Sequence, residues 1–173
     1  MRYQILQRPV VFGLVLWLSP SMTMAQSLIV DAGAMLGAGV ERGATQNESA
    51  VVRSPVFADI NVRAFTDEDD RVAFGGSARI EMTGLGGLAL VPRAELRHKL
   101  GTVELRPGIA FPIFIMPKTL LGPEASCAFR IPLSRGLGLQ TMVFVTAYLA
   151  GANLPANASL IQFGGALGLS LYL

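Results

Sequence analysis

The sequence predicts an all-β protein, a single eight-stranded antiparallel, up-and-down transmembrane β-barrel. Apolar residues recur at every second position in eight segments, which is the period of a strand with one apolar and one polar face. The charged residues of these segments all lie on the polar face. The chain is 51% hydrophobic, yet between residues 31 and 135 its charges recur too closely for a membrane-spanning helix of roughly 20 residues. Strands must therefore carry the apolar residues.

Residues 1–25 are typical of a cleaved secretory signal peptide. Two arginines precede an uncharged apolar run at residues 10–18, and small residues stand three and one positions before a cut after Ala25. A membrane anchor is the alternative, but this run is far shorter than the roughly 20 residues that cross a bilayer as a helix. We therefore expect export, followed by folding of residues 26–173 as one β-barrel domain.

Removal of the signal peptide leaves a chain without net charge. It takes away two of the 14 basic residues and none of the 12 acidic ones, so 12 of each remain. A neutral chain provides no electrostatic support for a nucleic-acid partner. Cys127 is the single cysteine, so it has no partner for an internal disulfide and is too isolated for a metal site. The sequence predicts no cofactor and no metal.

The first four predicted strands cover residues 29–41, 55–65, 71–82 and 88–97. Their even positions are mostly apolar, and their odd positions carry the charges. In chain order, the charged residues of this face are Asp31, Glu41, Asp59, Arg63, Arg71, Arg79, Glu81, Arg93, Glu95 and Arg97.

The last four predicted strands cover residues 102–115, 124–131, 137–149 and 160–173. The seventh and eighth have no charge on either face. The charged residues of the fifth and sixth are Glu104, Arg106, Glu124 and Arg130.

Segments rich in glycine, proline and polar residues connect the predicted strands. The longer loops are at 42–54, 83–88, 116–123 and 150–159, and the shorter turns are at 66–70, 98–101 and 132–136. The even number of strands brings both termini to one side. Pro107 and Pro112 fall inside the fifth strand, where each removes a donor from the ladder, and a local bulge is one way to accommodate them.

The distribution of charge between the two faces favours a membrane barrel. Seven arginines and seven acidic residues share one face, and the other face has none. A charge on the lipid face costs about 2–4 kcal/mol at the midplane, so apolar residues face lipid and polar residues face inward. We expect the fourteen side chains to pair inside the barrel, where an unpaired ion is expensive. An eight-stranded barrel has a lumen that side chains can fill, so no open pore is expected.

The C-terminal segment carries a resemblance to a known family. Residues 168–173 alternate in the manner of a barrel insertion signal, with Gly168, Leu171, Tyr172 and Leu173 as its key positions. With the length and strand plan, this segment resembles the small OmpA/OmpX-type outer-membrane barrels, although there the last residue is usually aromatic. The resemblance implies a bacterial outer-membrane location, periplasmic termini and outward-facing long loops. It also implies two partners, the barrel-insertion machinery and outer-membrane lipid.

Candidate catalytic groups have simpler structural interpretations. His98 is the only histidine and lies in a predicted turn on the side of the termini. The acidic pairs Glu81 with Glu95 and Glu95 with Glu104 lie among arginines, so ion pairing is the simpler explanation. The glycines at 84–87 are followed by a strand, whereas a dinucleotide-binding loop requires a helix there. We therefore expect no catalytic site.

These observations favour a non-enzymatic envelope protein with a structural, adhesive or surface-interaction role, whose loops contact a surface partner. Three alternatives stay open. They are a narrow outer-membrane channel, an enzyme that modifies outer-leaflet lipid, and an inner-membrane protein in which residues 137–173 form a helical hairpin.

Overall fold

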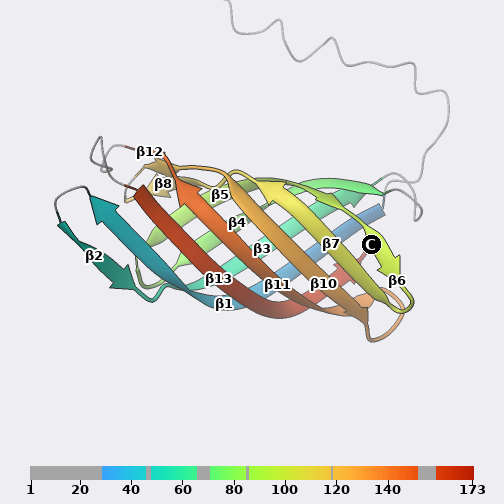
Figure 1. The fold of residues 1–173 in the computed structure, drawn as a ribbon. Helices are drawn as coiled ribbons and strands as arrows, with labels where there is room; N and C mark the ends of the chain where they lie inside the picture. The colour runs from blue at the N-terminus through green and yellow to red at the C-terminus, as the bar shows by residue number, and fades with distance from the viewer. Residues whose placement is uncertain (1–28, 46–47, 66–70, 85, 118, 152–158) are drawn as a thin grey trace, which may run out of the picture.

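The computed structural model describes residues 29–45, 48–65, 71–84, 86–117, 119–151 and 159–173. They form one closed antiparallel sheet, an eight-stranded barrel with strands tilted to its axis (Figure 1). The predicted fold class is confirmed. The predicted signal peptide and the acidic turn at 67–70 lie outside the described residues.

The chain crosses the barrel wall eight times. Each crossing is called a stave, and some staves are divided into two short strands. Four staves are single strands: β1 (Ile29–Thr45), β3 (Val56–Phe65), β4 (Val72–Glu81) and β13 (Ser159–Tyr172). Four are divided: β5 (Gly87–Leu96) with β6 (His98–Leu100), β7 (Val103–Ala110) with β8 (Ile113–Met116), β9 (Leu120–Leu121) with β10 (Glu124–Pro132), and β11 (Leu137–Tyr148) with β12 (Ala150–Gly151).

The first and last staves close the barrel. β1 pairs with β3 on one side and β13 on the other, so Asp31 lies opposite both Arg63 and Tyr172. β5 completes the ring by pairing with both β4 and β7. All pairings are antiparallel between consecutive staves, as the up-and-down plan requires.

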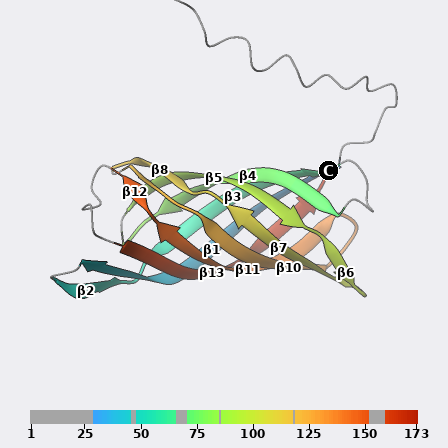
Figure 2. The ribbon, with the colours of Figure 1, turned by 45° about the horizontal axis from the view of Figure 1, so that its top comes forward.

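The loop predicted at 42–54 is instead a hairpin extension. β1 continues to Thr45 and pairs with β2 (Glu48–Arg53), with Glu41 opposite Arg53. This hairpin projects beyond the barrel at the end opposite the C-terminus (Figures 1 and 2). The predicted turn at 98–101 is also shorter than expected. His98 begins β6, and the turn narrows to residues 101–102, where Gly101 has a φ of +63° that favours glycine.

The prolines of the fifth stave interrupt the ladder without a bulge. Pairing between β5 and β7 ends at Gly108, and β6 resumes it at Leu105 in the same register. Phe111 donates its N–H to the Pro92 carbonyl of β5 at 3.0 Å. Backbone donors of a strand alternate between its two neighbours, so the nitrogen of Pro107, four residues earlier, also points towards β5. This nitrogen carries no hydrogen to donate. The register shift in the pairing of β5 with β8 lies near Leu88, which is opposite Met116, and not at Pro107 or Pro112.

The two faces of the sheet differ sharply. Large apolar side chains are exposed around the outside, among them Leu36, Ile60, Phe74, Leu90, Ile109, Val143 and Leu167. The inside combines charged residues with two apolar clusters. No helix in the described part of the chain has the length and apolarity to cross a membrane. The helical hairpin considered for residues 137–173 is wrong, because β11 and β13 occupy this part of the chain.

Candidate functional site

Thirteen of the fourteen predicted interior charges are buried. They are Asp31, Glu41, Asp59, Arg63, Arg79, Glu81, Arg93, Glu95, Arg97, Glu104, Arg106, Glu124 and Arg130. The prediction is wrong for Arg71, whose side chain is exposed. It precedes the first residue of β4 at the end of the barrel, where alternation no longer determines burial.

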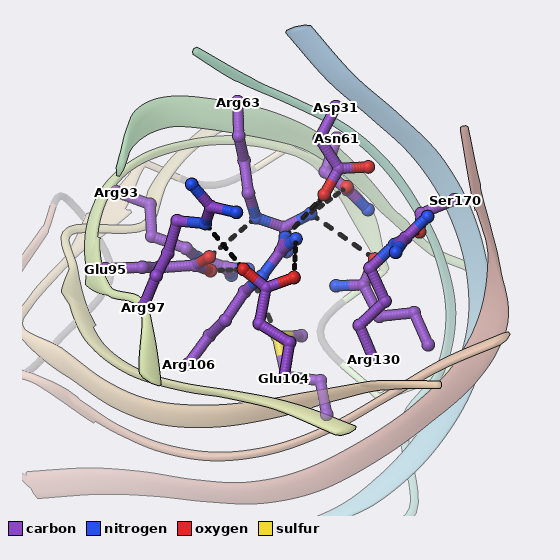
Figure 3. A network of polar contacts seen from close by, with 12 residues as sticks. Asp31, Asn61, Arg63, Arg93, Glu95, Arg97, Glu104, Arg106, Arg130 and Ser170 are labelled. Atoms are coloured by element: carbon purple, nitrogen blue, oxygen red, sulfur yellow. Dashed lines mark hydrogen bonds and ion pairs between the residues drawn. The ribbon is translucent and has the colours of Figure 1, made fainter. Parts of the chain in front are cut away.

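One group of ion pairs crosses the lumen towards the end that holds the C-terminus (Figure 3). Arg106 of β7 pairs with Asp31 of β1 and lies 2.9 Å from Glu104. Arg63 of β3 lies 2.7 Å from Glu95 of β5 and 3.7 Å from Asp31. The strands β1 and β7 lie on opposite sides of the barrel, so these side chains fill the lumen between them.

A second group surrounds Glu124 of β10. Its carboxylate accepts hydrogen bonds from Arg79 at 2.8 Å and from Arg93 at 3.1 Å. Arg79 also lies 3.4 Å from Asp59. Arg93 lies 3.6 Å from Glu95, and this contact joins the two groups into one network. Each of the five acids named so far in the two groups thus contacts at least one arginine.

Aromatic side chains share the lumen with this network. The Arg79 guanidinium lies 4.2 Å from the ring centre of Phe144 and 5.2 Å from that of Phe57. The two rings contact edge to face at 5.5 Å. Phe57 and Phe144 were not predicted to face inward, although each has the same parity as the charged residues of its own strand or of the strand paired with it. The odd or even position of each residue along its strand is therefore the sequence signal that identifies both as inward-facing.

The inward glycines make room for more than arginines. A Cβ on Gly138 would lie 2.7 Å from the Arg130 guanidinium carbon, so glycine at this position leaves space for an arginine. A Cβ on Gly37 or Gly164 would instead meet a ring atom of Phe57 at 2.3 Å or Phe144 at 2.4 Å. Glycine therefore admits aromatic rings into the lumen as well.

At the far end of the lumen, two buried acidic residues, Glu41 and Glu81, lie among neutral polar and apolar side chains. Gln162 donates to Glu81 at 2.6 Å and accepts from the Tyr148 hydroxyl at 2.8 Å. Beside Tyr148, Val91, Phe114 and other small or apolar side chains form a buried cluster. Glu41 is buried at this end. The side chains of this end therefore also fill the lumen.

A hollow opens at the end that holds the C-terminus. Its volume is about 640 Å³, and its walls include Phe65, Arg97, Arg130 and Tyr172. Arg97 lies 2.5 Å from Glu104 and stacks 3.8 Å from the ring centre of Phe65. Arg130 stacks at the same distance on Tyr172. Each of these two guanidinium groups is thus stacked on an aromatic ring in the wall of the hollow.

The residues of the predicted insertion signal lie at this end as well. Tyr172 points inward, and its hydroxyl donates to Glu104 at 2.5 Å. Leu171 and Leu173 are exposed on the outer side. Gly168 lies opposite Met35, and a Cβ there would come within 1.9 Å of the Ala34 carbonyl oxygen. The alternation predicted for the terminal segment is therefore present, and Gly168 has a packing role.

The groups considered for catalysis do not converge. His98 is exposed in β6. Glu95 contacts Arg63 and Arg93, whereas Glu81 accepts from Gln162. Among the described residues, no group of three histidine, cysteine or acidic side chains could hold a metal.

Comparisons with known proteins identify the fold alone. The chain is similar to the crystal structure of Neisserial surface protein A (NspA), with a TM-score of 0.58 and 8% sequence identity over 83% of this chain and 96% of that one. It is also similar to a designed transmembrane β-barrel, with a TM-score of 0.48 and 10% identity over 80% of this chain and 95% of that one. The similarity to NspA concerns the fold, an eight-stranded barrel.

The comparisons at the level of sequence find no relative. No protein-family model matches this chain. No curated protein matches it either.

Proposed function

We propose that this protein resides in a bacterial outer membrane and has a structural, adhesive or surface-interaction role rather than a catalytic or transport role. One observation carries the proposal. Thirteen buried charged residues occupy the lumen, ten of them in ion pairs with one another, while large apolar side chains cover the outside. Lipid supplies no hydrogen bonds, so a sheet that faces it must close, as this sheet does.

The filled lumen argues against a channel. Arg106 reaches Asp31 and Arg79 reaches Glu124 across the barrel, and such paired charges would have to separate before an ion could pass. We expect little or no single-channel conductance in planar bilayers. Stepwise conductance from the purified barrel at neutral pH would contradict this part of the proposal.

Within the described part of the chain, the groups considered for catalysis do not converge, and this favours a non-enzymatic role. If the chain modified outer-leaflet lipid, a deletion strain would lose one species of modified lipid. We expect the lipid mass spectrum of that strain to match the parent. A lipid species missing from the deletion strain and restored by the wild-type chain would overturn this expectation.

Location is tested by separating the envelope membranes and running the outer-membrane fraction on a heat-shift gel. We expect the chain in the outer membrane, with a mobility that changes on boiling and a β-type circular dichroism spectrum in detergent. Recovery in the inner membrane would contradict the proposal.

The surface role is tested at the β1–β2 hairpin, which projects beyond the barrel. Replacement of residues 44–50 by a two-residue Asn-Gly turn would shorten the hairpin and keep Gly43 opposite Val51, so the strands of the barrel keep their register. We expect reduced settling of cell suspensions and reduced retention on polystyrene. The control is Ser134→Gly in a turn at the opposite end. If the hairpin variant behaves like the control in both assays, the adhesive role is wrong.

A further inference from the structure

The charged residues of the lumen are not evenly matched along the barrel. Asp31, Asp59, Glu95, Glu104 and Glu124 pair with Arg63, Arg79, Arg93, Arg97 and Arg106. Arg130 differs from these arginines. It is 4% exposed, and among the described residues no carboxylate lies within 4 Å of its guanidinium. A buried guanidinium without an anionic partner is costly, so its position calls for an explanation.

Neutral groups hold Arg130 in one orientation. Its Nε donates to the Ser170 hydroxyl at 2.8 Å and its Nη2 donates to the Gly136 carbonyl at 2.7 Å (Figure 3 shows the first contact). Its guanidinium stacks 3.8 Å from the ring centre of Tyr172. Gly138 leaves the space that the group occupies. These contacts use two of the five N–H donors of arginine, and Nη1 makes no hydrogen bond within the described part of the chain.

Arg130 borders the hollow of about 640 Å³ at the mouth of the barrel, and Arg135 on the adjoining turn borders it too. The acidic side chain in its wall, that of Glu104, is already engaged by Arg97, Arg106 and the Tyr172 hydroxyl. The Arg130 side of the hollow is therefore cationic.

We propose that Arg130, assisted by Arg135, binds a phosphate group at this mouth of the barrel. A guanidinium fixed in one plane suits two phosphate oxygens, and charge-assisted hydrogen bonds of this kind are stronger than neutral ones. The hollow is large enough for a group of this size. The phosphate is carried either on the head group of a membrane phospholipid or on a small soluble phosphate compound.

Calorimetric titration tests the soluble source. The barrel, folded in a phosphate-free maltoside detergent, is titrated with inorganic phosphate and, separately, with acetate. We expect saturable phosphate binding that weakens at least about tenfold in Arg130→Gln and less in Arg135→Gln. The control is Arg71→Gln, which removes an exposed arginine at the same end outside the hollow and should leave binding unchanged. Arg130→Lys keeps the charge without the planar fork and should bind at an intermediate strength.

Native mass spectrometry tests the lipid source. The barrel is transferred from vesicles of phosphatidylethanolamine and phosphatidylglycerol into maltoside, and retained phospholipid is counted in the wild type and in each variant. Retention lost in Arg130→Gln and Arg135→Gln but not in Arg71→Gln, without binding of inorganic phosphate, identifies the head group. Phosphate binding without retained lipid identifies the soluble source.

Three results would overturn the proposal. They are the absence of both kinds of binding, equal binding by Arg130→Gln and wild type, and acetate binding as tight as phosphate binding. The heat-shift gel shows first whether each variant is folded. If Arg130→Gln does not fold, Arg135→Gln decides, because Arg135 is exposed and its replacement leaves the lumen network intact. Binding unchanged in a folded Arg135→Gln then counts against the site.

Discussion

At the scale of single residues, the lumen is organised by side chains that serve several neighbours. Glu124 contacts Arg79, Arg93 and the Thr146 hydroxyl, so one carboxylate connects four strands. Desolvation offsets much of the attraction within a buried ion pair. Loss of one partner is nevertheless costly, because the remaining charge stays buried without compensation. Such residues are therefore expected to dominate the effects of mutation.

Glu124→Gln should lower the free energy of unfolding by about 3–5 kcal/mol, because it leaves Arg79 and Arg93 with one acidic contact each. Urea titration followed by gel mobility and far-ultraviolet circular dichroism measures the change. Arg71→Gln is the matched control and should change stability by less than about 0.5 kcal/mol, because Arg71 is exposed. A Glu124→Gln variant as stable as this control would show that the network contributes little.

Gly164 and Gly165 offer a matched pair of neighbouring sites. A Cβ on Gly164 would lie 2.4 Å from a ring atom of Phe144, whereas on Gly165 it would meet nothing closer than 3.5 Å. Gly164→Ala should therefore destabilise the barrel by about 1–3 kcal/mol through overpacking. Gly165→Ala should be neutral or slightly stabilising. Urea midpoints check both, and Phe144→Leu should rescue Gly164→Ala. Equal effects at the two sites would contradict the placement of Phe144.

At the scale of elements, prolines weaken the ladder between β5 and β7. The register is the same before and after Pro107, so only the missing donor interrupts the pairing. In a lipid environment a backbone carbonyl without a donor is more costly than in water. The stave formed by β7 and β8 is therefore the weak part of this wall.

Pro107→Val should strengthen this wall, because it restores one N–H opposite β5 and places an apolar side chain on an exposed site. We expect a gain of about 0.5–1.5 kcal/mol in the free energy of unfolding, the net contribution of one hydrogen bond. Amide exchange in β5 and β7 should slow as well. A loss of stability would mean that the ring of Pro107 itself supports the local backbone.

At the scale of the whole molecule, the cost of a charge on the outer face distinguishes a membrane barrel from a soluble one. Ile60 lies near the middle of β3 and is 59% exposed, and Met82 lies just beyond β4 and is 58% exposed. In water the two sites would tolerate a charge equally well. In a bilayer they differ, because the cost of a charge depends on depth.

Ile60→Arg should cost about 2–4 kcal/mol in lipid vesicles, and Met82→Arg about 0–1 kcal/mol. Reversible unfolding in urea from vesicles gives both values. The same variants in a short-chain detergent should differ less, because a micelle adapts its shape around a charge. Equal costs at the two sites in vesicles would place the outer face in water and contradict the membrane assignment.

Much of the architecture was predictable from the sequence, because strand alternation is a local property. The eight staves, the antiparallel plan and the face that carries the charges all follow from the period of two. The errors lie at strand ends. The hairpin at 42–54 was predicted as a loop because its residues show no apolar alternation, and Arg71 was predicted inside because alternation does not show that it precedes β4. The apolar part of the lumen was missed because Phe57, Phe114 and Phe144 have the composition of an outer face.

The sequence by itself determined which face of each strand turns inward, because side chains alternate between the two faces along a strand. Only the tertiary structure decided which of them meet. The contacts of Arg106 with Asp31, of Arg79 with Glu124 and of Gln162 with Glu81 join strands far apart in the chain, and they depend on the tilt and stagger with which the barrel closes. The same closure leaves Arg130 at the mouth without an acidic partner among the described residues, which no local pattern encodes.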